Sequence, residues 1–319
     1  MAKVKYSEDM TKAQRISKVV LTILGVFLGI VFIVPFLLIL INSFKTKKEL
    51  FTSVLALPEK ISNGFENYKI AFERLDFVKS FGTSLFITVF SIIIIVICTS
   101  MAAWMLQRTK SKVSNAILML MVVSMLIPFQ AVMLPLIRIM GKIGFLNKYG
   151  LIFMYLGFQG SMSTFLYHGF VKNIPRDLDE AATIDGCNTF QTFWYIIFPL
   201  LKPITVTVAI LNLVAIWNDY LLPSLVIGGK TETIPLKTFL FFGEYTKQWH
   251  LALAGLVITI LPVLIFYFFA QKQVLSSMVE GSVKYILRDA KKHSFSLLTM
   301  IFFGGILNKK NAFNLVQRD

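Results

Sequence analysis

Charged side chains are confined to clusters along this chain, and long stretches without charge separate the clusters. A helix needs about 20 apolar residues to cross about 30 Å of hydrocarbon, because it rises about 1.5 Å per residue. Six stretches exceed that length, and only the fifth contains a formal charge, Asp219. They are residues 19–44, 80–107, 113–137, 149–171, 203–229 and 248–271.

The six stretches favour helices over the strands of a membrane barrel. Both forms satisfy every backbone hydrogen bond in lipid, but barrel strands are segments of about 10 residues whose side chains alternate between apolar and polar. Residues 92–97 are instead six consecutive branched aliphatic residues. The pattern predicts an all-α polytopic membrane protein with six transmembrane helices, which form one domain over residues 19–275.

Composition supports a membrane protein and excludes two other classes. Of 319 residues, 56% are hydrophobic and 15% charged, whereas about a quarter of a soluble domain is charged. So apolar a chain is not disordered, and two cysteines cannot make a disulfide framework. The first stretch follows a basic segment as a signal peptide would, but it is too long and no cleavage site ends it. We expect an uncleaved helix.

Lysine and arginine indicate the orientation of the chain in the membrane. If residues 1–18 are cytoplasmic, the cytoplasmic segments hold 19 basic residues and the outside segments 13. Residues 1–18, the short loop 108–112 with Arg108, Lys110 and Lys112, a loop over 172–202 and the residues from 272, which include a tail over 276–319, would then be cytoplasmic. The net charge of +15 is explained by basic residues beside anionic lipid, and no nucleic-acid partner is expected.

The sequence contains no complete catalytic or cofactor-binding motif. Gly229-Lys230-Thr231 resembles the end of a phosphate-binding loop, but Ser224 stands where that motif requires glycine. The three histidines are scattered without the spacing of metal ligands. We therefore expect no cofactor, no metal and no enzymatic activity of this chain itself.

The cytoplasmic loop 172–202 carries signals for two short helices. Pro175 is suited to the first position of a helix, and acidic residues follow it, as the positive end of a helix dipole favours. Gly186 supplies a stop. Asn188 and Gln191 form the N-terminal signature of a second helix, which Pro199 would end. Its apolar stripe comprises Phe190, Phe193, Trp194, Ile197 and Phe198.

This loop resembles the EAA loop of ABC importer permeases. Glu180-Ala181-Ala182, Gly186, Ile196 and Pro199 match the family pattern EAA-x3-G-x9-I-x-L-P, with Phe198 in place of the usual leucine. Three further stretches are similar to the carbohydrate-type permeases of the maltose class (MalG-like): Ile127-Pro128-Phe129-Gln130, Trp217-Asn218-Asp219 and Leu261-Pro262-Val263. A simple interfacial hairpin is the alternative interpretation of the loop.

The resemblance implies a subunit driven by other proteins. It implies an ATPase subunit dimer, which binds ATP and contacts the loop, a second permease subunit, an extracytoplasmic solute-binding protein and a sugar or oligosaccharide as substrate. The binding protein would meet outside segments such as 45–79. The residues expected to couple the loop to the ATPase are Glu180, Ala181, Ala182, Asp185, Gly186, Ile196 and Pro199.

Polar side chains within the predicted spans are candidates for the substrate path, because such groups are costly in lipid and usually functional. The alternative for each is a hydrogen bond between helices without substrate contact. Asn212 and Asp219, seven residues apart, should share one helix face, and Pro128 and Pro135 can break or kink the third helix around Gln130. The candidates are Gln130, Gln159, Asn212, Trp217, Asn218, Asp219 and Tyr220.

Two other functions compete with an ATP-driven importer. A self-contained ion- or proton-coupled transporter would often carry inverted repeats, and no clear internal repeat is visible. An intramembrane enzyme would need histidine, cysteine or paired acids that this chain lacks at suitable positions. The tail contains a charge-free segment, 294–308, that is too short to span comfortably.

Overall fold

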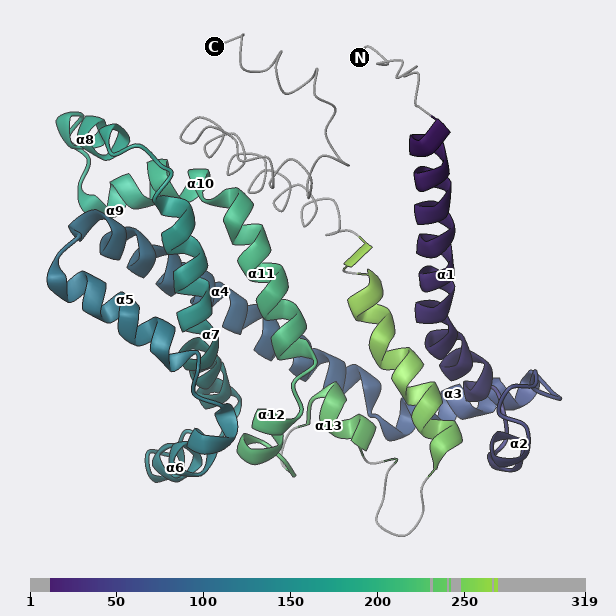
Figure 1. Ribbon diagram of the computed structural model, residues 1–319. Coiled ribbons are helices and arrows are strands. Elements are labelled where there is room, and N and C mark those ends of the chain that lie inside the picture. The colour runs from purple at the N-terminus through teal and green to yellow at the C-terminus, as the bar shows by residue number, and fades with distance from the viewer. Residues whose placement is uncertain (1–11, 230–231, 240, 242–247, 266, 269–319) are drawn as a thin grey trace.

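The computed structural model describes residues 12–229, 232–239, 241, 248–265 and 267–268, and these contain helices and no strands (Figure 1). The predicted all-α fold is therefore confirmed. The predicted tail 276–319 lies outside the described residues, as does most of the N-terminal segment. The helices are α1 (Lys12–Ser43), α2 (Lys47–Thr52), α3 (Ser62–Arg74), α4 (Phe77–Thr109), α5 (Lys112–Ser124), α6 (Phe129–Lys142), α7 (Lys148–Val171), α8 (Asp177–Ile184), α9 (Thr189–Gln191), a π-helical turn (Thr192–Ile197), α10 (Phe198–Leu200), α11 (Lys202–Trp217), α12 (Leu221–Val226), α13 (Ile234–Phe239) and a last helix over Trp249–Ile265.

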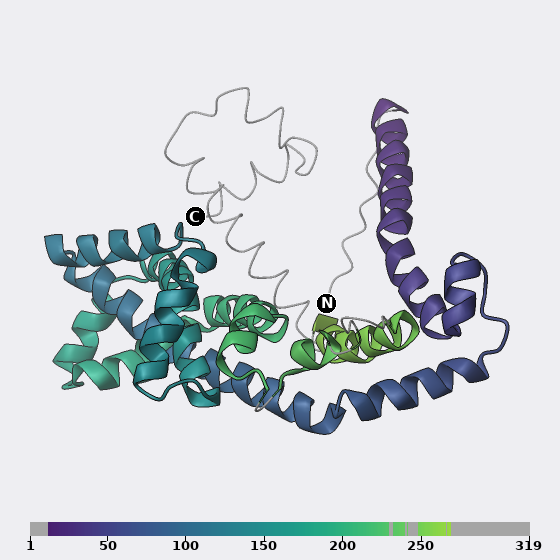
Figure 2. The same cartoon turned by 90° about the horizontal axis from the view of Figure 1, so that it is seen from below.

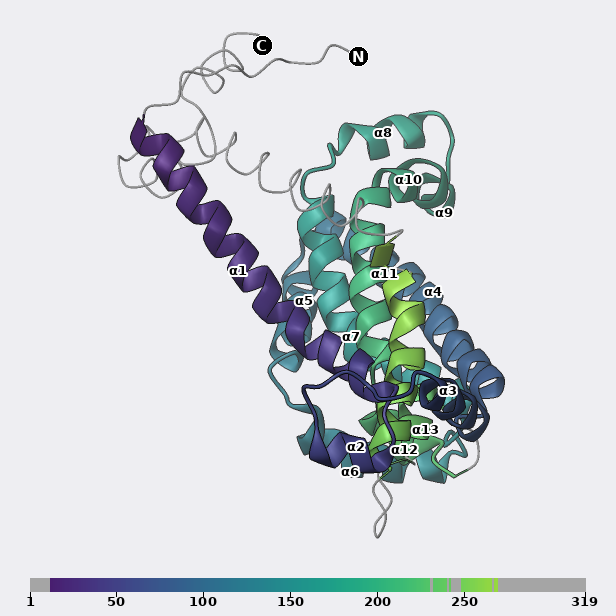
Figure 3. The ribbon, with the colours of Figure 1, turned by 90° about the vertical axis from the view of Figure 1, so that its right-hand side faces the viewer.

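Helices α4, α7 and α11 pack together at the centre of the molecule (Figures 1 and 3). Small residues allow close packing of α4 and α7, where a Cβ added to the buried Gly160 of α7 would lie 3.8 Å from Thr99 Cγ2 of α4. Small side chains let two helix backbones approach closely, and this close packing stabilises helix pairs in lipid. The three helices form the scaffold that supports the loop 172–202 and carries most of the candidates for the substrate path.

Helix α1 stands apart from this bundle (Figure 2). Its apolar side chains are exposed over most of its length, Phe32 by 72% and Leu21 by 64%. The N-terminal end of α1 lies at the same end of the molecule as α8, α9 and α10 (Figures 1 and 3). Side chains this apolar need lipid or another protein chain around them.

The described helices do not by themselves give the six membrane spans that the sequence predicts. Among the described helices, residues Ile16–Ser43 of α1 and all of α4 are long and apolar enough to cross a membrane alone. Two bent pairs, α5 with α6 and α9–α10 with α11, would add one span each if each pair crosses as a unit. The last described helix is shorter, and residues 269–271 of its predicted stretch lie outside the description. The count of six remains a prediction.

Two predicted spans are interrupted: the third near Pro128, where the prolines predict a break or kink, and the fifth, for which a continuous helix is expected. The stretch 113–137 bends by 105° between α5 and α6, where Pro128 takes an extended backbone in front of α6. Proline has no N–H to continue a helix, and Pro135 is accommodated inside α6. The stretch 203–229 breaks after Trp217. There Asp219 accepts the backbone N–H of Leu221 at 3.0 Å, so its side chain competes with helical hydrogen bonding.

A buried lysine fixes the turn at the far end of α1. The Lys45 ammonium is fully buried and donates to Asn42 Oδ1 and to the carbonyl oxygens of Ser53 and Val54, at 2.8 to 3.0 Å. Nearby, the Glu49 carboxylate accepts the backbone N–H and the hydroxyl of Thr46, both at 2.7 Å, and a further backbone N–H. These hydrogen bonds stabilise the charged carboxylate and so lower the pKa of Glu49, and the bond from the Thr46 backbone N–H has the largest effect.

Candidate functional site

The loop 172–202 folds as two short helices at one end of the bundle, as its sequence predicts (Figure 3). Helix α8 ends in a Schellman motif, in which the N–H of Cys187 bonds the carbonyl of Ala182 and the N–H of Gly186 bonds that of Thr183. Gly186 has φ +80°, a left-handed conformation that glycine adopts without strain. Gly186 therefore sets the corner between the two helices.

The start of α8 differs by two residues from the prediction. Asp177, not Pro175, is the first helical residue. Ile174 is buried just before it, and the Ile174 carbonyl accepts two hydrogen bonds from Arg108 of α4 at 3.2 Å. Residues 174 and 175 lie outside the helix, which begins only after Arg176.

The second helix begins with the predicted capping pair but continues past Pro199. Asn188 and Gln191 exchange side-chain and backbone hydrogen bonds of 2.9 Å. A π-helical turn over Thr192–Ile197 then widens the helix, and the N–H of Phe198 bonds the carbonyl of Phe193, five residues back. Pro199 can donate no hydrogen bond and would clash with a carbonyl four residues earlier in a regular helix. The wider turn accommodates the proline, and the helix ends at Leu200.

One face of this second helix is part of the bundle core. Phe193 and Ile197 are fully buried, in a cluster with Trp104 of α4, Tyr167 of α7 and Val208 of α11. Two more members of the predicted stripe, Trp194 and Phe198, are half-buried, with rings 4.9 Å apart, but Phe190 is 62% exposed.

The predicted coupling residues divide into exposed and buried positions. Glu180, Ala181, Asp185, Gly186 and Pro199 are exposed, Ile196 is half-buried, and Ala182 is buried. Only one of the two alanines therefore contributes to the surface. Ile184, next to the Gly186 corner, is 86% exposed, so an apolar side chain and acidic residues share this surface, which we call the corner surface (Glu180, Ala181, Ile184, Asp185 and Gly186).

Contacts with the end of α4 position α8, and the sequence alone gave no sign of them. Asp179 Oδ2 lies 2.8 Å from an Arg108 nitrogen, and Asp179 Oδ1 accepts the Trp104 indole N–H at 2.9 Å. Arg176 in turn donates to the backbone carbonyls of Gln107 and Arg108. Arg108 is predicted only as a basic residue of a short loop and Asp179 only as an acidic residue of a helix start.

Two substrate-path candidates, Asn212 of α11 and Asp219 just beyond it, face α7. Tyr155 donates its hydroxyl to Asp219 Oδ2 at 2.9 Å. The buried Asn212 donates to Ser163 Oγ at 3.0 Å. Asp219 lies beyond the end of α11, but both side chains point to the same neighbouring helix.

A polar seam joins α7 to α11. On α7 it comprises Tyr155, Gln159, Ser163 and Tyr167, which share one face at a spacing of four residues. Tyr167 donates to Thr205 at 3.0 Å, so three hydrogen bonds tie this face to Thr205, Asn212 and Asp219. The half-buried Gln159 lies between two of them. The structure thus gathers three predicted path residues, Gln159, Asn212 and Asp219, along one seam.

The remaining candidates lie around the two helix breaks. Trp217 is buried, with its ring 5.6 Å from that of Phe81, and Tyr220 is stacked on Phe239 at 3.9 Å between ring centroids. Asn218 is exposed. Gln130 is also exposed, in the first turn of α6, and is not part of the seam contacts among the described residues.

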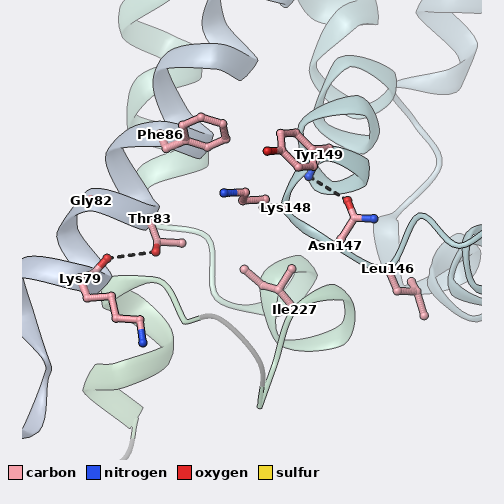
Figure 4. Close-up of a pocket in the computed structure, with 9 residues that line it drawn as sticks. All are labelled: Lys79, Gly82, Thr83, Phe86, Leu146, Asn147, Lys148, Tyr149 and Ile227. Atoms are coloured by element: carbon pink, nitrogen blue, oxygen red, sulfur yellow. Dashed lines mark hydrogen bonds between the residues drawn. The ribbon is translucent and has the colours of Figure 1, made fainter.

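A cleft of 610 Å³ lies at the opposite end from the corner surface, where α4 and α7 begin (Figure 4). The Lys148 ammonium extends into it, 4.9 Å from the ring centroid of Phe86 and 5.2 Å from that of Tyr149. Ammonium groups over aromatic faces are attracted by the ring quadrupole. The cleft is lined by Lys79, Gly82, Thr83, Phe86, Leu146, Asn147, Lys148, Tyr149 and Ile227.

This arrangement is the fold of an ABC transporter permease. A crystal structure of a bacterial ABC transporter involved in the import of the acidic polysaccharide alginate contains a chain that superimposes with a TM-score of 0.66. The two chains are 22% identical, and the match covers 83% of this chain and 99% of that one.

Residues 95–275 match the family described as binding-protein-dependent transport system inner membrane component. The chain is 53% identical over 270 residues to the probable starch degradation products transport system permease protein AmyC of Thermoanaerobacterium thermosulfurigenes, covering 84% of this chain and 98% of that protein. It is 34% identical to the multiple sugar-binding transport system permease protein MsmG of Streptococcus mutans, covering 86% and 100%. The chain belongs to this family of membrane permeases, which are transport subunits and not enzymes.

Proposed function

We propose that this chain is the membrane-spanning permease subunit of an ATP-driven importer for a sugar or oligosaccharide. The observation that carries the proposal is the exposed, glycine-set corner surface on a loop anchored in the bundle core. The names of the relatives AmyC and MsmG, which refer to starch degradation products and to multiple sugars, support the substrate class.

The corner surface would contact an ATPase subunit dimer. Glu180 and Asp185 offer negative charge to a basic groove, and Ile184 offers an apolar side chain that a partner would bury. Apolar side chains surrounded by polar ones are typical of protein interfaces. ATP would be bound and hydrolysed by that partner.

Substrate would pass beside the polar seam and the helix breaks. Asp219, Tyr220 and Trp217 place a carboxylate next to aromatic rings at the end of α11, and sugars bind to such combinations of hydrogen-bonding groups and aromatic faces. The path would open alternately to the two sides of the membrane. A second permease subunit would complete it and would cover part of the exposed α1.

The orientation of the chain follows from the same assignment. If the corner surface meets a cytoplasmic ATPase, the N-terminal end of α1 is also cytoplasmic, because the two lie at the same end of the molecule (Figure 1). The opposite end, with the 45–79 segment and the cleft of Figure 4, would then face an extracytoplasmic binding protein that delivers the solute.

A cysteine crosslinking experiment tests the assignment. In a chain with Cys98 and Cys187 replaced by serine, Ile184→Cys should crosslink to a co-expressed ATPase subunit, because that side chain is 86% exposed at the corner. Phe165→Cys, which is exposed on α7 six residues before that helix ends, is the matched control and should give no such product.

Transport in reconstituted vesicles is the second part of the test. Uptake should require the ATPase subunit and ATP. Uphill accumulation by this chain alone would contradict the proposal and would favour an ion- or proton-coupled transporter.

A further inference from the structure

Arg108, at the cytoplasmic end of α4 in the proposed orientation, contacts both α8 and the chain segment that leads into it. One of its nitrogens lies 2.8 Å from Asp179 Oδ2, and both terminal nitrogens donate to the Ile174 carbonyl at 3.2 Å. The Arg108 side chain is 14% exposed and that of Asp179 is 20% exposed. An ion pair so shielded from water is screened little by salt, and its planar guanidinium fixes its geometry.

Trp104, one turn earlier on α4, holds the other oxygen of the same carboxylate. Its indole N–H donates to Asp179 Oδ1 at 2.9 Å, and its ring lies 5.5 Å from that of Phe193 in the second helix of the loop. Trp104 is 6% exposed. One Asp179 oxygen therefore accepts a hydrogen bond and the other forms an ion pair, both with side chains of α4, and the same tryptophan contacts both helices of the loop.

Arg176 completes the contacts from the opposite direction. It donates to the carbonyl oxygens of Gln107 and Arg108, at 3.3 and 3.0 Å. These carbonyls belong to the last turn of α4, where a helix has no partners of its own to offer. The end of α4 and the start of α8 therefore satisfy each other's polar groups.

We propose that Arg108 and Trp104 are positioning residues, which bind Asp179 so that a displacement of the corner surface moves α4. We call the Trp104, Arg108, Arg176 and Asp179 contacts the α4–α8 clamp. Without these contacts the chain would bend at Pro175, and a displacement of the corner surface would move only the loop. With them, α8 and the end of α4 move as one body. The proposal rests on the proposed function, because it assigns a use to the motion that an ATPase would impose.

The competing explanation is that these residues only stabilise the fold. The two explanations differ in whether ATP hydrolysis stays coupled to uptake when the clamp is removed. If the clamp only stabilises the fold, its loss should lower uptake and ATP hydrolysis together, in proportion to the amount of assembled transporter. If it transmits motion, ATP hydrolysis should continue while uptake falls. The ratio of solute transported to ATP hydrolysed is therefore the informative quantity.

The test compares Arg108→Met, Asp179→Asn and the double variant in vesicles that contain the assembled transporter. We expect each single variant to lower the transport-to-hydrolysis ratio by about tenfold, within the usual range of coupling between sites. The double variant should be no worse than the singles, because both remove the same interaction. Asp177→Asn, two residues earlier and exposed, is the matched control and should keep the parent ratio.

Conservative variants grade the effect. Trp104→Phe keeps an aromatic ring against Phe193 but removes the N–H donor, so the ratio should fall by about threefold, as expected for one hydrogen bond. Arg108→Lys retains the charge without the planar fork and should lie between the parent and Arg108→Met. Full activity of Arg108→Met at normal protein levels would overturn the proposal.

Hydrogen exchange gives a readout that does not depend on the ATPase. Amides of residues 177–184 should exchange faster in Arg108→Met and Asp179→Asn than in the parent, with no change in Asp177→Asn. Unchanged exchange would overturn the clamp, whatever the transport result. If the parent chain shows no Ile184→Cys crosslink to an ATPase, the proposed function fails, and exchange still decides whether the clamp holds α8.

Discussion

The two ends of α11 are attached to the rest of the bundle in different ways. At the loop end, the preceding helix buries Phe193 and Ile197 in the core, and α8 is bound to α4 by an ion pair and charge-assisted hydrogen bonds. At the other end, residues 218–220 have one side-chain hydrogen bond to α7, from Tyr155 to Asp219, and the Tyr220 ring is stacked on Phe239. Ile216 and Leu222, on either side of the break, are buried in an apolar cluster with residues of α7.

This difference indicates that the two ends of α11 have different roles in transport. Several buried contacts must break before the loop end moves relative to α4 and α7, so that end suits the transmission of force. One hydrogen bond between half-exposed or buried side chains contributes about 1 kcal/mol, which thermal motion and a bound solute can offset. The break at residues 218–220 therefore suits a gate. Four experiments can break or sharpen this comparison.

The largest effect is expected at the corner of the loop. Gly186→Val places a β-branched residue at φ +80°, where a side chain costs about 1–2 kcal/mol or more, although no atom lies within 4 Å of the added Cβ. The corner should reorient, and uptake should fall by more than about tenfold, a larger loss than the strain alone.

Gly186→Asn is the control for this change, because asparagine tolerates the left-handed conformation. It should retain most of the uptake, measured per amount of chain in the membrane. Equal losses in the two variants would show that backbone conformation is not what matters at this corner.

A smaller effect is expected at the gate. Asp219→Leu removes the acceptor for both the Tyr155 hydroxyl and the Leu221 N–H, so uptake should fall about fivefold while basal ATP hydrolysis by the assembled transporter is kept. Asp219→Asn keeps a carbonyl acceptor and should lose less. A loss of hydrolysis in Asp219→Leu would contradict the separation of the two ends.

The middle of the seam should contribute to stability more than to transport. Asn212→Ala removes the bond to Ser163, which is worth about 0.6 kcal/mol on average between membrane helices. The thermal unfolding midpoint in detergent should fall by about 1–3 °C, given the usual relation for a domain of this size. The exposed Asn218→Ala should leave it unchanged within error. A drop of ten degrees would mean that the seam holds the bundle together.

The smallest effect concerns the turn beyond α1 and depends on pH. Hydrogen bonds from Thr46 and the Glu59 N–H lower the folded-state pKa of Glu49, so the carboxylate contributes stability above its unfolded-state pKa. That contribution is lost as pH falls through the lowered value. Between pH 7 and 3, the thermal midpoint of the parent should fall slightly more than that of Glu49→Gln. Parallel curves would show that Glu49 contributes nothing.

Local signals in the sequence predicted the loop well. The Asn188–Gln191 cap and the Gly186 stop each depend on residues within one turn, and both are where the spacing puts them. The break within the stretch 113–137 was also predictable, because Pro128 has no N–H with which to continue a helix. The all-helical fold follows from the length of the apolar stretches.

Long-range partners were not predictable from one sequence. Arg108 and Asp179 are 71 residues apart, and nothing in the spacing of either residue points to the other. The break after Trp217 has no proline or glycine at the break itself, since Asn218, Asp219 and Tyr220 occupy it. It depends on a side chain that bonds backbone and Tyr155, a choice that only the packed neighbours decide.

The π-helical turn before Pro199 gives the fixed spacing from Gly186 to Ile196 a geometric meaning. A π turn holds one more residue than an α turn, so it offsets the phase of every residue after it by about 100°. If one residue were removed and Thr192–Ile197 wound as a regular α-helix, the two changes would offset each other, and the corner would keep its direction while Ile197 stays in the core. The π turn therefore lets this segment hold one additional residue between the two motifs without changing the direction of the corner.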